Sequence, residues 1–351
     1  GAADAGVETL RRAAEEATRA RNPALEADVL SALGGALVHA VRGFDGEGAV
    51  VLHRALGAAR TAGRPGVAAD ILRKLAFVDV QAGRHASADR ALREATKQAA
   101  DLNDRSLTAG ILAVQGMNEA DRGRHITAAE TLTESAAVAQ HAGRARRQAW
   151  SLGILARSLL LSANTQQART AADASIALAR QERWNAFLPW PQVMRAHALI
   201  EAGDWDTAAR ETETAFALAC ELGDPCWEGM AGCTLGLIAL HAGDHGTAHT
   251  WITDARRRCD RVPDRYVWVS AYIGLADLEL AVRDPTRVAT SAAARLHTDA
   301  ARADLPEFLA WALVHQAELG DHSRISPART AAAAVANPVL QARARALTRL
   351  T

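Results

Sequence analysis

The residues best suited to bind a metal are histidines in the second half of the chain. His241, His245 and His249 follow one another at four-residue spacing, which would place three imidazoles on one face of a continuous helix. Gly243-Asp244 lies between the first two histidines and predicts the end of a helix there. We therefore expect the histidines to serve packing, and we predict neither a metal site nor a cofactor.

Cysteines give a second possible metal site. Cys220, Cys226 and Cys233 are separated by five and six residues, a spacing that matches no common zinc finger or ribbon. No secretory signal precedes them, so the cysteines are expected to be free thiols in a reducing compartment. We interpret them as small buried apolar groups and predict a cytoplasmic location.

Motifs for catalysis are absent from the sequence. It has no phosphate-binding loop, no His-Glu-x2-His, no Gly-x-Ser-x-Gly and no calcium-binding loop. The glycine-rich segment 43–48 falls between two predicted helices, whereas a dinucleotide-binding loop follows a strand. An (α/α) toroid enzyme would need clustered carboxylates, and no Asp-Asp-x2-Asp motif occurs. We predict that the chain is not an enzyme.

Two arginine runs, 144–147 and 256–258, have the chemistry to contact phosphate or an acidic partner. The whole chain, however, has 40 basic and 40 acidic residues, without the basic excess that drives binding to nucleic acid. We therefore interpret both runs as solvated helix ends and predict no direct nucleic-acid binding. No apolar run reaches the roughly 18 residues that cross a bilayer, so we predict no membrane partner either.

Tryptophans are concentrated in the middle of the chain. Six of the eight fall within about a hundred residues, at positions 150, 184, 190, 205, 227 and 251. Aromatic rings beside arginines commonly hold a ligand or a peptide. The alternative is that these rings fill wide gaps between alanine-rich helices. Which of the two applies depends on the elements that carry them.

Those elements recur with a period of 40 residues. Breaks in helical pattern fall at Gly43, Gly83, Gly123, Ala163, Gly203, Gly243 and Arg283. A second series falls at Pro23, Gly63, Asn103, Gly143, Arg183, Gly223, Pro263 and Ala303. Two interleaved series that keep phase over more than 240 residues indicate a repeat array of paired helices. Because each repeat packs only on its neighbours, one array can extend over all 351 residues.

Side-chain size follows the same period. Seven residues before each first break the residue is small, as at Ala76, Gly116 and Gly236. Nine residues after the break it is often large and apolar, as at Leu132 and Ile252. Small residues let two helix axes approach, and large ones fill the groove beside them. The pattern predicts short helix pairs in close contact, with Pro285 in the first turn of a second helix.

The segment Gly203-Asp204-Trp205, with Ala196 before it and Ala208 and Ala215 after it, resembles the tetratricopeptide repeat (TPR) in a 40-residue form. The resemblance implies an all-α, right-handed superhelical solenoid of about eight TPR-like helix–turn–helix repeats. We predict one solenoid over residues 1–351, with an N-terminal capping helix in 1–23, repeats in 24–320 and C-terminal capping helices in 321–351. Ala163 and Arg283 lack the glycine of the other breaks, so we expect irregular geometry there.

The 40-residue form also resembles the C-terminal sensor or effector arrays of MalT-like and LuxR-type bacterial transcription regulators. In TPR arrays the first helix of each pair lines a concave groove, so the resemblance places part of the tryptophan cluster there. The groove candidates share phases of the first helices and are Gln115, Trp150, Arg157, Trp190, Arg195, His197 and Met230.

We therefore predict a non-catalytic binding module, the ligand- or partner-sensing TPR region of a larger cytoplasmic bacterial regulator. Its partner would be a protein, a peptide or a small-molecule inducer in the groove. The alternative is a stand-alone TPR adaptor that assembles other proteins. Flanking sequence with a phosphate-binding loop or a helix-turn-helix would favour the regulator.

Overall fold

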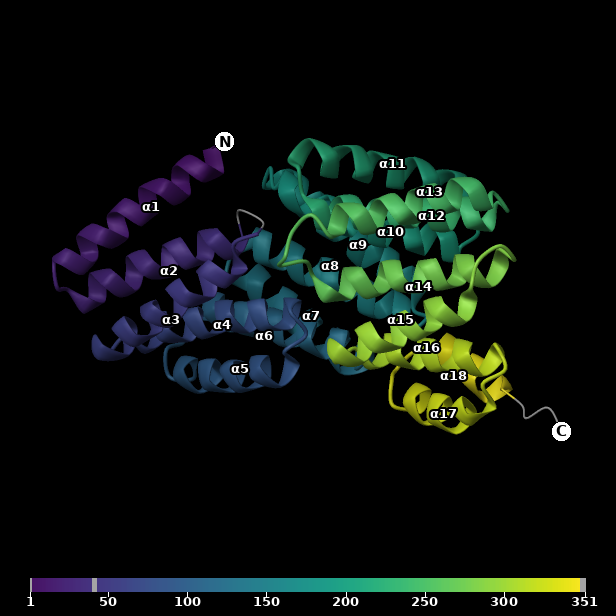
Figure 1. Ribbon diagram of the computed structural model, residues 1–351. Helices are drawn as coiled ribbons and strands as arrows, with labels where there is room; N and C mark the ends of the chain where they lie inside the picture. The colour runs from purple at the N-terminus through teal and green to yellow at the C-terminus, as the bar shows by residue number, and fades with distance from the viewer. Residues whose placement is uncertain (1, 40–42, 348–351) are drawn as a thin grey trace.

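The computed structural model describes residues 2–39 and 43–347, which are helical almost throughout and contain no β-strand (Figure 1). The α-helices are α1 (Ala2–Arg19), α2 (Pro23–His39), α3 (Asp45–Thr61), α4 (Pro65–Gln81), α5 (His85–Ala99), α6 (Arg105–Asp121), α7 (His125–His141), α8 (Ala145–Leu161), α9 (Thr165–Gln181), α10 (Pro189–Glu201), α11 (Trp205–Leu222), α12 (Pro225–His241), α13 (His245–Cys259), α14 (Val267–Arg283), α15 (Ala289–Arg302), α16 (Pro306–Glu318), α17 (Ile325–Ala333) and α18 (Pro338–Ala346). Two single-turn helices, η1 (Asn185–Phe187) and η2 (His322–Arg324), lie between them. The chain is an all-α, right-handed superhelical solenoid of TPR-like repeats, as the sequence predicted.

The predicted breaks are the turns between helices. Even-numbered helices from α2 to α16 are the first helices of eight pairs in the described residues, and α1 and α18 lie at the two ends. Glycines at most breaks have positive φ, for example Gly203 at 81° and Gly243 at 79°. Ala163 has a β-carbon where the other breaks have glycine, but it adopts the same left-handed conformation, with φ of 61°. The turn at Ala163 is therefore regular, contrary to our expectation.

The turn after Arg283 differs from the others. Helix α14 ends at Arg283 and is followed by Asp284 in an extended conformation, and α15 begins only at Ala289. Pro285 therefore lies in the connecting segment, and its predicted place in the first turn of the second helix is wrong. Asp284 accepts hydrogen bonds from the backbone N–H and the hydroxyl of Thr286, which stabilises a local turn in place of a helix start.

Small and large residues meet within each pair as their spacing predicted. A β-carbon added at Gly116 would lie 2.5 Å from Leu132, and one added at Gly236 would lie 2.6 Å from Ile252. Both distances are too short for non-bonded carbons, so in these two pairs the large residue of the second helix occupies the space that a side chain on the first helix would need. This local contact recurs because the repeat recurs.

The superhelix closes on itself after about five and a half repeats. The backbone N–H of Gly43 donates to Asp264, and the backbone N–H of Ala336 donates to the carbonyl of Gly123. Between these contacts, a β-carbon on Gly83 would lie 2.5 Å from the carbonyl oxygen of Ala303. Successive turns of the first three repeats thus meet successive loops about 220 residues later. Figure 1 shows the C-terminal helices lying beside α6 and α7.

The interior faces of the first helices are therefore partly covered by the chain itself. Buried side chains form a core that runs from Val7 on α1 to Ala312 on α16, and a smaller cluster joins α16, α17 and α18. No helix in the described part of the chain has the length and apolar character needed to cross a membrane.

Candidate functional site

A cavity of about 910 Å³ opens inside the superhelical turn. Its walls come from the first helices α2, α4, α6, α8 and α12 and from the segments that precede α3, α10, α12 and α14. The volume lies at the upper end of the range for small-ligand pockets. We name this space the inner cavity. Its lining residues are Val38, His39, Phe44, Arg73, Phe77, Gly110, Ala113, Val114, Arg146, Arg147, Trp150, Trp184, Ala186, Phe187, Leu222, Gly223, Asp224, Pro225, Trp227 and Val262.

Aromatic side chains form much of the inner cavity wall. Phe77 of α4 meets Trp150 of α8 edge-on, with ring centroids 6.3 Å apart. Trp184 stacks on Phe187 at 4.6 Å at the start of α10. Trp227 lies half-buried at the start of α12, and its indole N–H donates to the carbonyl of Ala186. These rings supply apolar surface from four of the repeats, at α4, at α8, before α10 and at α12.

Two further apolar side chains of the cavity remain open to solvent. Phe44 is 40% exposed and Leu222 is 39% exposed, although large apolar groups in a packed core would be covered. Both line the inner cavity. Exposed apolar side chains in a concave site are typical of a place where a ligand or partner binds.

Arginines line the inner cavity beside these aromatic rings. Arg73 of α4 pairs with Asp70, which also pairs with Lys74 at 2.9 Å. Arg147 of α8 donates to the backbone carbonyl of Ser106 at 2.6 Å and forms no ion pair with any described residue. Burial, followed by the neighbouring charge of Arg73, lowers the pKa of Arg147 to about 10. Positive charge is therefore in excess on this wall.

Glycine 110 makes room for these arginines. A β-carbon on Gly110 would lie 1.7 Å from Nη1 of Arg147 and 2.9 Å from Cδ of Arg73. The two side chains therefore extend over the bare backbone of α6. Gly110 lies 40 residues before Trp150 and therefore at the equivalent position of the preceding repeat. Because glycine has no side chain, the cavity is open at the position where the next repeat has a tryptophan.

Next to the inner cavity, the chain fills its own interior. Arg157 is 1% exposed, donates to Asp121 at 2.6 Å and to the hydroxyl of Tyr266 at 2.7 Å, and lies over the rings of Trp190 and Trp268. Tyr266 and Trp268 belong to a repeat more than a hundred residues further along the chain. A second bridge joins His125 of α7 to Glu307 of α16 at 2.7 Å.

We call this region the sealed stretch. Its members are Asp121, His125, Arg157, Trp190, Tyr266, Trp268 and Glu307.

Several predicted groove residues lie in or beside the sealed stretch. Arg157 and Trp190 are buried there, and Met230 is fully buried nearby, because the returning repeats cover the groove at these positions. Their side chains contact other parts of the chain, so in this conformation they offer no open surface to a ligand. Trp150, by contrast, lies half-buried in the wall of the inner cavity. The binding roles assigned to all four remain predictions.

His197 and Arg195 lie on α10 and face different neighbours. His197 forms a hydrogen bond of 2.8 Å with the hydroxyl of Tyr272 on α14, and burial lowers its pKa to about 4. Arg195 pairs with Asp173 and Glu211 on the flanking helices α9 and α11. Both side chains have partners within the chain, and their contacts with a ligand remain predictions.

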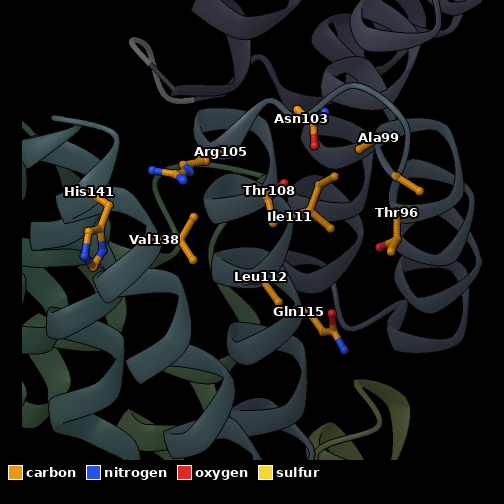
Figure 2. A pocket seen from close by; sticks show the side chains of 11 residues that line it. Thr96, Ala99, Asn103, Arg105, Thr108, Ile111, Leu112, Gln115, Val138 and His141 are labelled. Carbon is orange, nitrogen blue, oxygen red and sulfur yellow. The ribbon is translucent and has the colours of Figure 1, made fainter.

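Gln115 lies on the outer side of the array. It lines an open groove of about 950 Å³ over α6, flanked by α5 and α7. Figure 2 shows Gln115 and Leu112 along α6, with Thr96 and Ala99 on one side and Val138 and His141 on the other. We name this the outer groove. It is separate from the inner cavity, so the structure does not bring Gln115 together with Trp150.

Sequence reasoning missed several cavity residues that share one phase. Arg147, Phe187 and Trp227 each lie sixteen residues before a break, whereas the predicted candidates were taken from phases six, eight and thirteen before it. Comparing the repeats position by position could have found them, because large side chains recur sixteen residues before the break. The arginine run 144–147 was also noticed, but Arg146 and Arg147 line the cavity where we expected a solvated helix end.

Comparison with known proteins places the chain by its fold. No protein-family model matches the sequence, and a search of curated proteins finds none that matches. Solved structures do match over most of the chain. A Rap protein complexed with competence and sporulation factor has a TM-score of 0.61 and 14% identity, covering 96% of this chain and 87% of that one.

Two other structures extend this likeness. NprR in complex with its cognate peptide NprX has a TM-score of 0.65 and 12% identity, covering 89% of this chain and 90% of that one. A STAND protein with a tetratricopeptide repeat sensor from Pyrococcus horikoshii has a TM-score of 0.51 and 13% identity, covering 92% of this chain and 52% of that one. At these identities the likeness shows a TPR-like fold.

Proposed function

We propose that this chain is a binding module that holds a short, extended peptide in its inner cavity. The observation that carries the proposal is a cavity of about 910 Å³ that is lined by both aromatic rings and arginines. Aromatic faces supply apolar contact area, and arginines hydrogen-bond to backbone carbonyls or acidic groups. We infer no catalytic role, because this arrangement needs only shape and charge to act.

The similar structures support a peptide as the occupant. The NprR structure contains its cognate peptide NprX, and the Rap structure contains the competence and sporulation factor. An extended peptide also suits the geometry, since the cavity wall draws on helices from several successive repeats. A small-molecule inducer would use fewer of these contacts.

Binding would act on the curvature of the array. A peptide that contacts α4, α8 and α12 together favours the conformation in which those helices are correctly spaced. Since each repeat packs on its neighbours, a change in tilt at one interface passes to the closing contacts at Gly43, Gly83 and Gly123. The ligand would thus stabilise one state of the closed superhelix.

We further propose that residues 1–351 form one array that senses its ligand within a larger cytoplasmic bacterial regulator of the MalT-like or LuxR type. The TPR sensor named in the Pyrococcus horikoshii STAND protein supports a regulatory setting. The alternative is a stand-alone adaptor, which would bind its partners on the outer face. The outer groove of about 950 Å³ favours that alternative specifically.

Selection from a displayed library of random dodecapeptides, with the full chain as bait, tests the proposal. Selected peptides should lose affinity for Leu222→Trp, because the added ring occupies the cavity. Ile126→Trp is the matched control, since Ile126 is 64% exposed and does not line the cavity. If the peptides bind Leu222→Trp normally, or if none is selected, the inner cavity is not a peptide site.

A further inference from the structure

The basic wall of the inner cavity holds more positive charge than the chain neutralises. Arg73 and Lys74, whose side chains are 13% and 14% exposed, share the single carboxylate of Asp70. Arg147 beside them donates to the neutral backbone carbonyl of Ser106 and forms no ion pair with the described residues. Asp104 acts electrostatically on Arg147, so three cations face two carboxylates and one positive charge remains in excess. Charges removed from water in this way are normally paired.

The chain holds Arg147 in this position at a cost. Its guanidinium lies over Gly110, where any larger residue would collide with Nη1 at 1.7 Å. The same glycine lets Cδ of Arg73 lie 2.9 Å from the added β-carbon, so the two arginine side chains cross the same spot on α6. Burial and the charge of Arg73 together disfavour the charged form of Arg147. Asp70 and Asp104 offset part of this effect, and an anion in the cavity would offset the rest.

The surroundings define which anion would fit. Arg147 lines the cavity together with the aromatic side chains of Phe77 and Trp150. A planar guanidinium matches a carboxylate in a two-point hydrogen bond. One uncompensated cation also matches a single negative charge better than a dianion. The ligand should therefore carry a carboxylate next to an apolar or aromatic group.

We propose that the basic wall of the inner cavity is a carboxylate subsite, in which Arg147, assisted by Arg73 and made accessible by Gly110, binds an acidic group of the ligand. The proposal rests on the proposed function, because it assigns one end of the peptide that the cavity would hold. The carboxylate comes from the C-terminus of the peptide or from an acidic side chain. Both sources present the same group to Arg147.

Three probes separate the subsite from the cavity as a whole. N-acetyl-phenylalanine has a free α-carboxylate, N-acetyl-phenylalaninamide is its neutral counterpart, and N-acetyl-aspartyl-phenylalaninamide has only a side-chain carboxylate. Each is titrated into the full chain labelled with ¹⁵N-tryptophan. The indole signals of Trp150, Trp184 and Trp227, assigned by substitution, report on the inner cavity.

We expect at least one acidic probe to bind about tenfold more tightly than the neutral amide, the size of one charge-assisted contact. The acidic probe that binds identifies the source of the carboxylate. The preference should disappear in Arg147→Met and weaken in Gly110→Ala, where the added β-carbon displaces the guanidinium. Arg144→Met removes a charge from the same run at an exposed position outside the cavity wall and should keep the preference.

Other outcomes overturn the inference in distinguishable ways. If all three probes shift the cavity indoles with equal affinity, the carboxylate subsite is wrong and the peptide-binding proposal stands. If Arg147→Met and Arg144→Met lose the preference equally, the effect is long-range charge and the subsite is again wrong. If no probe shifts the three indoles at millimolar concentration, the inner cavity is not a binding site and both proposals fall.

Discussion

The sealed stretch and the inner cavity are neighbouring parts of the same superhelical interior, and each contains an arginine from α8. Arg157 is enclosed by Asp121, Tyr266 and two tryptophan rings that its own chain supplies. Arg147, less than three helical turns earlier, has a backbone carbonyl as its hydrogen-bond partner and no ion pair with the described residues. The difference lies in the opposite wall, which the returning repeats provide for one arginine and not for the other.

This comparison distinguishes a structural arginine from one available to a ligand. Around Arg157 the chain supplies a carboxylate, a phenol and aromatic faces, so the charge of the guanidinium is neutralised within the protein. Removing this arginine would leave the carboxylate of Asp121 as a buried, unpaired anion. Where that wall is missing, the guanidinium remains open to an ion pair with a group from outside the chain. The two regions should therefore respond in opposite ways to substitution and to ligand.

The largest expected effect is the loss of stability in Arg157→Met. The substitution leaves the buried carboxylate of Asp121 without its cation, which typically costs about 3–5 kcal/mol. Urea unfolding followed by circular dichroism would measure it. The matched change Arg147→Met should alter the free energy of unfolding by less than about 1 kcal/mol and in either direction. Equal losses in the two variants would remove the distinction between the regions.

A smaller expected effect is a change with pH in the free energy of unfolding, caused by a histidine in the part of the interior that the returning repeats cover. His197 contacts Tyr272 of the returning α14, and its pKa falls from an ordinary value near 6.5 to about 4. The unfolded chain therefore binds a proton that the folded chain does not between pH 6.5 and pH 4. His197 thus favours folding fully above pH 6.5, and this contribution decreases as the pH falls through that window.

Between pH 4 and pH 6.5, the contribution of His197 to the free energy of unfolding should rise by up to about 1.4 kcal/mol per pH unit. Unfolding free energies of the natural chain and of His197→Gln, measured across pH 4 to 7, would isolate it by difference. Parallel curves for the two proteins would show that His197 is not held neutral by the interior.

The smallest expected effect belongs to the inner cavity. Leu222→Ser shortens a side chain that is already 39% exposed, so the free energy of unfolding should change by no more than about 0.5 kcal/mol. The fully buried Leu132, changed in the same way, should lose several times as much. A large loss in Leu222→Ser would mean that the cavity wall belongs to the packed core.

The sequence was sufficient for the fold because its information is local. Gly116 meets Leu132 within a single repeat, and the same spacing returns every 40 residues, so turns and helix pairs could be predicted from their period. The closure of the superhelix involves residues about 220 positions apart. Whether the superhelix closes depends on the small tilts at all the interfaces between repeats added together. No single residue spacing in the sequence predicts that total.

The same limit explains the mixed outcome for the candidate site. Their positions within the repeat predicted that Trp150, Arg157 and Trp190 face the interior of the superhelix. Whether such a side chain is exposed to a ligand depends on which residues lie opposite it across the superhelix. Tyr266 and Trp268 cover Arg157 and Trp190, whereas Trp150 remains in the wall of the cavity. Arg147 was missed because its run was interpreted from net charge alone.

Hydrogen–deuterium exchange of the full chain, alone and with a selected dodecapeptide, tests the central claim most directly. The account predicts slow exchange around the sealed stretch in both states, and new protection with peptide in 184–187 and 222–227, which border the inner cavity. Protection confined to 96–115 and 138–141, around the outer groove, with no change at the cavity, would contradict it.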